Sequence, residues 1–276
     1  MADIDDREPN LQEGIEYWNN QPATYDGVLG GFGEGSLPRI DALGSRLFLL
    51  NHLPELSTVS SALKLLHPLP KERRTRALDV GAGVGRVTAD VLLYLVDDVL
   101  LLEPVAPFIN EAVHRAKNPD PKLKNWKGLT NKTTSVTFIQ GPLQAFDPAH
   151  PLNTTDVKLL ERVGSQQDDL ESGFDVVWCQ WCLGHLSDEQ LSAFFKRART
   201  SLRDPERSLM VVKENVCRDT ADNQPRISYD EEDSSLTRSD LAWKSVFHEA
   251  GLTLVSEKVQ TGLPEGIYVV KMYALR

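Results

Sequence analysis

The sequence predicts an α/β fold: a seven-stranded, mostly parallel sheet with one antiparallel strand, helices on both faces, and a helical extension at the N-terminus. Beyond residue 71, short apolar segments alternate with segments of helical periodicity, which is the pattern of parallel strands joined by crossover helices. The last two apolar segments follow one another without an intervening helix, which favours one antiparallel strand. The 276 residues, of which 41% are hydrophobic and 25% charged, are typical of a soluble protein with a sizeable core.

Residues 1–70 are expected to form a helical extension that contains a glycine-rich segment. "LQEGIEYWNN" (11–20) has a short helical pattern, and "PRIDALGSRLFLLNHLP" (38–54) has the apolar spacing of an amphipathic helix. "STVSSALKLLH" (57–67) is a further helical stretch. "YDGVLGGFGEGS" (25–36) is expected to be too flexible for regular structure, and both a lid over a ligand and a simple connector are compatible with it.

Residues 71–276 are expected to form the main domain. Its strands are predicted at 77–80, 98–104, 135–142, 174–181, 208–216, 252–259 and 267–275. Its helices are predicted at 85–96, 106–118, 188–202 and 238–251. Two polar segments between strands, 119–134 and 148–173, do not fit this alternation and are interpreted as surface insertions.

Charge and composition exclude several classes of function. A net charge of -10 argues against a nucleic-acid partner and leaves two interpretations, a cationic partner or a charge that only maintains solubility. The first residues lack the pattern of a secretory signal, and no apolar run is long enough to span a membrane, so we expect a cytoplasmic protein, also found in the nucleus, without a membrane partner. We expect a monomer or weak dimer. Cys179 and Cys182 form a C-x-x-C pair that is interpreted as buried small residues, with no metal expected.

A glycine-rich turn follows the first predicted strand, in the stretch "DVGAGVG" (79–85). Gly81, Gly83 and Gly85 allow a tight turn and bring backbone N–H groups close to a ligand, although glycines alone also fit an ordinary strand-to-helix turn. The spacing is G-x-G-x-G rather than the dinucleotide fingerprint G-x-G-x-x-G. Asp79, two residues before the first glycine, would repel a pyrophosphate but can organise the loop or accept hydrogen bonds from an ammonium group.

A second acidic residue points to the ligand. Glu103 ends the second predicted strand, directly before Pro104, and a carboxylate there can accept both hydroxyls of a ribose. Together with the loop, this favours an adenosine-bearing ligand without phosphates, S-adenosylmethionine. Arg86 begins the next helix, where it either pairs with the carboxylate of this cofactor or is solvated. Leu143 and Gln144 follow the third strand and are expected to contact the adenine.

The fourth predicted strand ends in "WCQWCLGHLSDEQL" (178–191), which places aromatic residues and a histidine at the mouth of the predicted pocket. Aromatic rings can hold an ammonium or a sulfonium by cation–π attraction. His185 lies just beyond the strand end, where an acceptor must bind.

At this point the chain shows a family resemblance. "YW" with "DGVLGGFG", "ALDVGAGVGR", "WCQWCLGHLSD", "VVKEN", "YDEEDSS" and "LPEGIYVVKMYALR" resemble, in order, the signature segments of the protein α-N-terminal methyltransferases. The resemblance covers most of residues 15–50 and 75–276 and implies the class I, Rossmann-like methyltransferase fold. It also implies methyl transfer from S-adenosylmethionine, with S-adenosylhomocysteine as product, to the α-amino group of proteins that begin X-Pro-Lys after Met removal. Ribosomal proteins are candidate substrates.

The resemblance also implies roles for individual residues. Cofactor contacts are implied at Gly81, Arg86, Glu103, Leu143 and Gln180. Substrate contacts are implied at Trp18, Trp181, Asn215, Asp230, Ser235 and Tyr268. A proton-accepting pair is implied at His185 and Asp233. The family more often has Asp where this chain has Glu103, which keeps the carboxylate but moves it by one methylene.

The chemistry constrains these roles, because only an amine with a free lone pair can attack the sulfonium methyl in line. The pKa of an α-amino group is ordinarily about 7.7 to 8.0, so His185 or Asp233, directly or through water, suffices to take its proton. The acidic run "SYDEEDSS" (228–235) fits a preference for Lys at the third substrate position, and it also fits an ordinary solvated loop. A methyltransferase for a small amine or another side chain, and a non-catalytic cofactor-binding assembly factor, are the alternatives.

Overall fold

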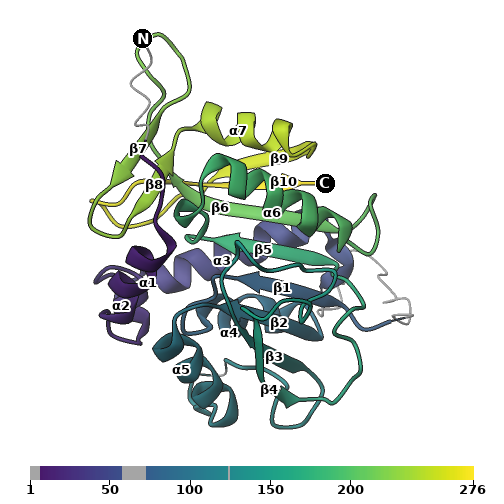
Figure 1. The fold of residues 1–276 in the computed structure, drawn as a ribbon. Helices are drawn as coiled ribbons and strands as arrows, with labels where there is room; N and C mark the ends of the chain where they lie inside the picture. The colour runs from purple at the N-terminus through teal and green to yellow at the C-terminus, as the bar shows by residue number, and fades with distance from the viewer. Residues whose placement is uncertain (1–6, 58–72, 124) are drawn as a thin grey trace.

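The computed structural model describes residues 7–57, 73–123 and 125–276. Its centre is an eight-stranded sheet with the order β4-β3-β2-β1-β5-β6-β10-β9 (Figure 1). The strands are β1 (Arg76–Val80), β2 (Asp98–Glu103), β3 (Ser135–Gln140), β4 (Lys158–Gly164), β5 (Val176–Gln180), β6 (Leu209–Val216), β9 (Leu254–Val259) and β10 (Val269–Leu275). Strands β3, β2, β1, β5 and β6 are parallel, and β10 is antiparallel to both β6 and β9. The mostly parallel sheet and its antiparallel β10 agree with the prediction.

The eighth strand, β4, is a correction, because it lies inside the segment 148–173 that was interpreted as a surface insertion. It pairs antiparallel with β3 at the edge of the sheet. Its sequence "KLLERVG" is half exposed and mixes charged with apolar residues, so the strand lacks the continuous apolar run of its central neighbours. The other expected insertion, 119–134, contains turns only among its described residues, but it buries Trp126 and Leu129 in the core.

Helices cover both faces of the sheet. On one face, α3 (Leu37–His52), α4 (Arg86–Asp90) and α5 (Ala106–Lys117) contribute to one buried apolar cluster. On the other face, α6 (Asp188–Thr200) and α7 (Asp240–Glu249) contribute to a second cluster. The sheet separates the two because successive strand residues point to opposite faces, as Ala77 and Leu78 of β1 do. The helix predicted at 85–96 is divided into α4 and the 3₁₀ turn η2 (Leu92–Tyr94).

The first two helices of the N-terminal extension and an acidic hairpin lie at one end of the sheet (Figure 1). The extension begins with α1 (Leu11–Asn19), which Asn10 caps, and α2 (Tyr25–Val28), which Thr24 caps. The short helix α2 corrects the expectation that 25–36 lacks regular structure. The 3₁₀ turn η1 (Pro54–Leu56) follows α3, and the helical stretch expected at 57–67 lies outside the described residues apart from its first residue.

The acidic run forms a two-stranded hairpin that the sequence did not predict. Its strands are β7 (Ile227–Asp230) and β8 (Ser235–Arg238). Its tip, residues 231–234, holds the remaining acidic residues of the run, and Ser234 adopts a left-handed backbone conformation with φ of 54°. The run of carboxylates therefore occupies a tight turn beside the N-terminal helices, in which Asp230, Glu231 and Glu232 are exposed to solvent.

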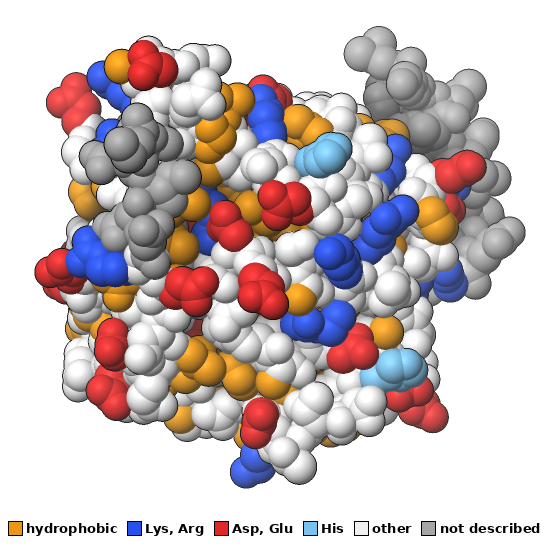
Figure 2. Space-filling view, turned by 45° about the horizontal axis from the view of Figure 1, so that its top comes forward, with side chains coloured by type: hydrophobic (Ala, Val, Ile, Leu, Met, Phe, Trp, Pro, Cys, Tyr) orange, Lys and Arg blue, Asp and Glu red, His pale blue; other side chains and the backbone are white. Residues whose placement is uncertain are grey.

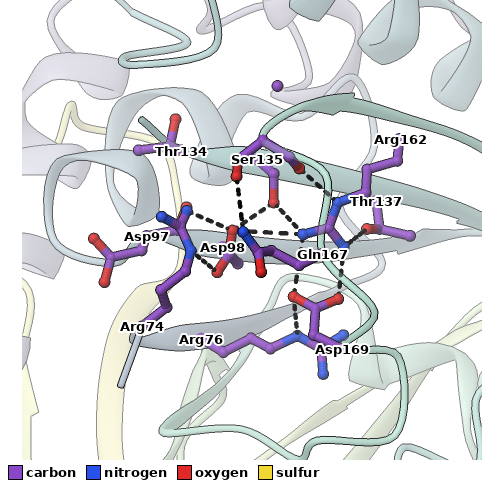
Figure 3. A network of polar contacts seen from close by, with 12 residues as sticks. Arg74, Arg76, Asp97, Asp98, Thr134, Ser135, Thr137, Arg162, Gln167 and Asp169 are labelled. Carbon is purple, nitrogen blue, oxygen red and sulfur yellow. Dashed lines mark hydrogen bonds and ion pairs between the residues drawn. The ribbon is translucent and has the colours of Figure 1, made fainter. Parts of the chain in front are cut away.

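At the opposite end of the sheet, a network of ion pairs joins the starts of the central strands (Figure 3). Asp98 at the start of β2 accepts two hydrogen bonds from Arg74, at 2.7 and 2.8 Å, and one from Ser135. Arg162 of β4 pairs with Asp169 at 2.6 Å and lies 3.6 Å from Asp98. This network holds the edge strand β4 to the parallel core.

Candidate active site

A hollow of about 990 Å³, counted out to its open mouth, lies at the carboxyl ends of β1, β2 and β5. Residues predicted from the sequence line much of it: Trp18, Asp79, Gly81, Gly83, Arg86, Glu103, Pro104, Leu143, Gln144, Gln180, Trp181 and His185. The structure therefore brings the predicted cofactor residues and part of the predicted acceptor site to one cavity.

The glycine loop after β1 forms one wall of the hollow, and its backbone explains the G-x-G-x-G spacing. Gly81, Gly83 and Gly85 all have left-handed backbones, with φ of 58°, 57° and 76°. A Cβ at Gly81 would lie 2.3 Å from the Cβ of Cys182, and a Cβ at Gly85 would lie 2.5 Å from the ring of Trp126. Neither position has room for a side chain, so the loop lies directly against its neighbours.

Two buried carboxyl groups belong to this wall. Glu103 accepts hydrogen bonds from the backbone N–H groups of Gly83 and Val105, both at 2.8 Å, and burial raises the pKa of Glu103 to about 7. Asp79 accepts a 2.6 Å hydrogen bond from the Thr88 hydroxyl, and burial raises its pKa to about 7 as well. Asp79 thus connects the loop to α4, which is the loop-organising role considered from the sequence, and Glu103 is fixed at the end of β2 beside the hollow.

Arg86 and Gln180 both line the hollow and share one hydrogen-bond acceptor, the carboxylate of Asp41. Arg86 is buried, which corrects the alternative that it is solvated, and its guanidinium pairs with Asp41 of α3 at 2.6 Å. Its guanidinium also lies over the ring of Trp181, 5.4 Å from the centroid. Gln180 donates a 2.8 Å hydrogen bond to the same Asp41. Sequence reasoning missed Asp41, because a single acid in an amphipathic helix is typical of a solvent-facing position.

The acceptor side is formed by His185, which lies in the 3₁₀ turn η3 (Leu183–His185), and by Trp18 of α1. The indole N–H of Trp18 donates a 2.9 Å hydrogen bond to Nε2 of His185. Burial lowers the pKa of His185 despite the nearby Asp233 carboxylate, whose Oδ2 lies 4.0 Å from Nε2. The imidazole is therefore neutral, with its hydrogen on Nδ1, since Nε2 accepts from Trp18.

Two buried polar atoms at this point have no hydrogen-bond partner among the described residues. They are Nδ1 of His185 and Oδ1 of Asp233. Buried polar groups in native proteins are nearly always paired, and unpaired ones are commonly found where a ligand or water binds. Oδ1 of Asp233 is thus an unpaired acceptor of the kind that an amine N–H requires, although Asp233 itself does not line the hollow, whereas Nδ1 of His185 lies against Gly14 of α1 and near the backbone of Ser234.

A basic residue of α6 holds the loop after β3, for which the sequence predicts contacts with the adenine. Arg197 donates hydrogen bonds to the backbone carbonyls of Leu143 and Gln144, at 3.2 and 3.3 Å. The Gln144 side chain in turn donates to the backbone carbonyl of His185 at 3.2 Å. The loop after β3 is thereby fixed against η3.

Four predicted substrate residues do not line the hollow. Ser235 begins β8, and a Cβ at Gly184 of η3 would lie 3.4 Å from its Cβ, so it is close to η3. Asn215 of β6 lies opposite Val270 of β10. Asp230 is exposed at the end of β7. Tyr268 is 54% exposed and lines a separate shallow depression.

Apolar residues from the N-terminal extension cover the hollow, and sequence reasoning missed them. Leu11 and Ile15 of α1 and Val28 of α2 line it together with Phe108 of α5. A Cβ at Gly14 would lie 3.1 Å from Nδ1 of His185, so α1 packs directly over the acceptor site. The helical periodicity of 11–20 predicted the helix, but only the tertiary structure shows what it covers.

The hairpin carboxylates face this cover. The pKa of Tyr17 of α1 is raised by partial burial and by the carboxylates of Glu232, Asp233 and Asp230. Asn10 donates its backbone N–H to Oγ of Ser234 at 2.9 Å. On the face drawn in Figure 2, acidic side chains lie among hydrophobic ones over the left half of the molecule. The hairpin thus places carboxylates beside α1, of which Glu231 is paired with Arg7.

Comparisons with known proteins agree with this site. A sequence profile of the family described as AdoMet dependent proline di-methyltransferase matches residues 6–276. The chain is 35% identical over 270 residues to alpha N-terminal protein methyltransferase 1 of Schizosaccharomyces pombe, covering 98% of this chain and 97% of that protein. It is 31% identical over 273 residues to N-terminal Xaa-Pro-Lys N-methyltransferase 1 of Rattus norvegicus, covering 99% and 98%.

A solved structure is also similar to this chain in fold and sequence. A SAM-dependent methyltransferase of Leishmania major superposes with a TM-score of 0.67 at 28% sequence identity, covering 96% of this chain and 82% of that chain. In the described part of the chain, no helix is long and apolar enough to cross a membrane. With a class I methyltransferase fold, a glycine loop beside a buried carboxylate, and these relatives over nearly its whole length, the chain belongs to the family of AdoMet-dependent α-N-terminal protein methyltransferases.

Proposed function

We propose that this enzyme methylates the free α-amino group of proteins whose mature N-terminus reads X-Pro-Lys, with ribosomal proteins among its candidate substrates. The observation that supports this most is the unpaired, buried Oδ1 of Asp233, whose carboxylate lies 4.0 Å from His185, a residue that lines the same hollow as the glycine loop and Glu103. Similarity to the rat N-terminal Xaa-Pro-Lys N-methyltransferase 1 supports the same substrate class. That the enzyme acts in the cytoplasm and nucleus, as a monomer or weak dimer, stays a prediction.

The residues that line the hollow fit S-adenosylmethionine. The left-handed glycine loop leaves backbone exposed to the cavity, and the Glu103 carboxylate at the end of β2 would hold the ribose hydroxyls. Leu143 and Gln144 would contact the adenine. Arg86 would pair with the carboxylate of the methionine end. When bound, the cofactor supplies an activated methyl group on a sulfonium, and the remaining chemistry belongs to the protein.

The protein must hold the amine in line and accept its proton. Nε2 of His185 is already occupied by the Trp18 N–H, so it cannot take a proton until that hydrogen bond breaks. Asp233 Oδ1 has no such partner among the described residues, so we assign the first proton acceptance to Asp233. His185, kept neutral by burial, orients the acceptor site and adds no positive charge beside the sulfonium. Most of the rate is expected from alignment.

Charge complementarity supports the Lys preference. Asp230, Glu231 and Glu232 follow one another in the hairpin at the edge of α1, close enough to raise the pKa of Tyr17 through two of them. A lysine two residues beyond the reacting amine would carry its ammonium toward these carboxylates. Trp18, Trp181, Asn215, Ser235 and Tyr268 stay predicted contacts of the peptide backbone and its proline.

Peptides test this function directly. We expect peptides that begin Ala-Pro-Lys or Pro-Pro-Lys to gain methyl groups in the presence of S-adenosylmethionine, measured by mass spectrometry, and their N-acetylated twins to gain none. Equal methylation of both twins would exclude the α-amine as the acceptor. A peptide that begins Ala-Pro-Glu should fail to bind. If it keeps its affinity, the acidic hairpin does not recognise the third residue of the substrate and is only a solvated surface feature.

A further inference from the structure

A fully buried carboxylate behind the hollow connects two of the side chains that line it. Asp41 of α3 has no solvent exposure and does not itself line the cavity. Its Oδ2 accepts a 2.6 Å hydrogen bond from Nη1 of Arg86, at the start of α4. Its Oδ1 accepts a 2.8 Å hydrogen bond from Nε2 of Gln180, at the end of β5. One carboxylate thus joins two elements of the cofactor site that are far apart in the sequence.

A buried lysine on the next strand balances this carboxylate. Nζ of Lys213 lies 2.6 Å from Oδ1 of Asp41 and has no solvent exposure. It also donates to Oγ of Ser45 at 3.0 Å and to Oε1 of Gln260 at 3.1 Å. Burial alone would raise the pKa of Asp41, but Arg86 and Lys213 hold it below its ordinary value. Asp41 is therefore ionised and is the shared carboxylate partner of two cations, Arg86 and Lys213.

The orientation of the Gln180 amide is determined at both ends. The indole N–H of Trp178 donates a 3.0 Å hydrogen bond to Oε1 of Gln180. Because an indole nitrogen only donates, Oε1 must face Trp178 and the amide NH₂ must face Asp41. The Arg86 guanidinium is fixed in a similar way, between Asp41 and the ring of Trp181. Neither side chain can rotate without losing its contact to Asp41.

We propose that Asp41 is a positioning residue for the cofactor: it orients Arg86 and Gln180, and through them it sets the affinity for the amino-acid end of S-adenosylmethionine. The inference rests on the proposed cofactor roles of Arg86 and Gln180. Replacing Asp41 by Asn leaves one carbonyl oxygen to face three donors, from Arg86, Gln180 and Lys213, and turns an NH₂ group toward at least one of them. Arg86 and Gln180 then lose the carboxylate that orients both side chains.

The test compares two ligands that differ at one end. S-adenosylhomocysteine has the carboxylate and ammonium of the amino acid, whereas 5′-methylthioadenosine keeps the nucleoside and the sulfur but lacks both. By calorimetry, Asp41→Asn should weaken the binding of S-adenosylhomocysteine by about tenfold, the lower end of the loss that follows when residues orienting metal-binding side chains are replaced. Its affinity for 5′-methylthioadenosine should equal that of the unmodified enzyme.

A matched control separates positioning from stability. Asp98 is also buried and held by arginines, but it lies at the opposite end of the sheet (Figure 3). Asp98→Asn should lower the melting temperature, as Asp41→Asn does, while leaving the affinity for both ligands unchanged. If Asp41→Asn alone fails to fold, the double variant Asp41→Asn, Lys213→Met removes the cation left without its partner and should fold with the same loss of S-adenosylhomocysteine affinity.

The outcomes are distinct. Equal weakening of both ligands by Asp41→Asn, or unchanged binding of both, would overturn the positioning role. Full recovery of S-adenosylhomocysteine affinity in the double variant would overturn it too, because the defect would then come from the unpaired Lys213 alone. Failure of the unmodified enzyme to bind S-adenosylhomocysteine would instead overturn the proposed function.

Discussion

Substitutions in the glycine loop give a quantitative test of how closely the loop is packed. Gly81 and Gly30 have nearly the same backbone, with φ of 58° and 57°, but a Cβ at Gly81 would lie 2.3 Å from Cys182, whereas a Cβ at Gly30 would meet nothing within 4 Å. A left-handed backbone costs a non-glycine residue about 1–2 kcal/mol. Forcing an extra methyl into a packed site costs about 1–3 kcal/mol more.

Gly81→Ala should therefore lower the free energy of unfolding by about 2–5 kcal/mol, and Gly30→Ala by about 1–2 kcal/mol. Gly83→Ala should resemble Gly30→Ala in stability, because its nearest contact, Val28, would lie at an ordinary 3.5 Å. Urea unfolding at constant pH measures all three, with the denaturant slope as a check that unfolding stays two-state. If Gly81→Ala lowers the free energy of unfolding by no more than Gly30→Ala does, the loop does not approach Cys182 as closely as the structure shows.

Three further predictions concern the site. Asp233→Asn should lower kcat far more than it changes the affinity for S-adenosylhomocysteine; unchanged turnover would remove Asp233 from the mechanism. Trp18→Phe keeps an aromatic ring but removes the N–H that donates to Nε2 of His185, so this nitrogen becomes free to bind a proton. The acidic limb of the kcat/KM–pH profile should therefore move to higher pH. An identical profile would show that the Trp18 hydrogen bond does not control the protonation of His185. Burial raises the pKa of Glu103 from 4.5 to about 7, so between these pH values the folded state keeps a proton that the unfolded state has released, and stability should fall as pH rises through this window. Glu103→Gln should reduce that slope in chemical denaturation and weaken S-adenosylhomocysteine binding; an unaltered slope and affinity would contradict both the burial effect and the ribose assignment.

The sequence predicted the central strands because they are buried on both faces. β1, β2 and β5 are buried along their whole length, and such strands appear as continuous apolar runs. The sequence did not predict β4, because it is an edge strand in which Lys158, Glu161 and Arg162 interrupt the apolar pattern. Its pairing also joins residues well separated in the chain, which local periodicity cannot report.

The site shows the same division between local and tertiary information. The glycine loop and Glu103 could be found from the sequence because their chemistry depends on local backbone shape and strand ends. The hydrogen bond between Trp18 and His185 joins residues 167 positions apart, and nothing in the residues around Trp18 indicates it. Asp41 could not be found either, because an acid becomes a buried ion partner only when Arg86 and Lys213 are brought to it by the fold.

The contact between α1 and the acidic hairpin has a consequence for how the protein is made. Asn10 and Ser234, whose hydrogen bond joins these elements, are 224 positions apart. On a ribosome α1 therefore emerges long before its partner surface, because the hairpin is translated more than two hundred positions later. We expect the nascent chain to form the central sheet progressively while α1 stays undocked, so that the enzyme acquires a closed acceptor site only after the hairpin has emerged.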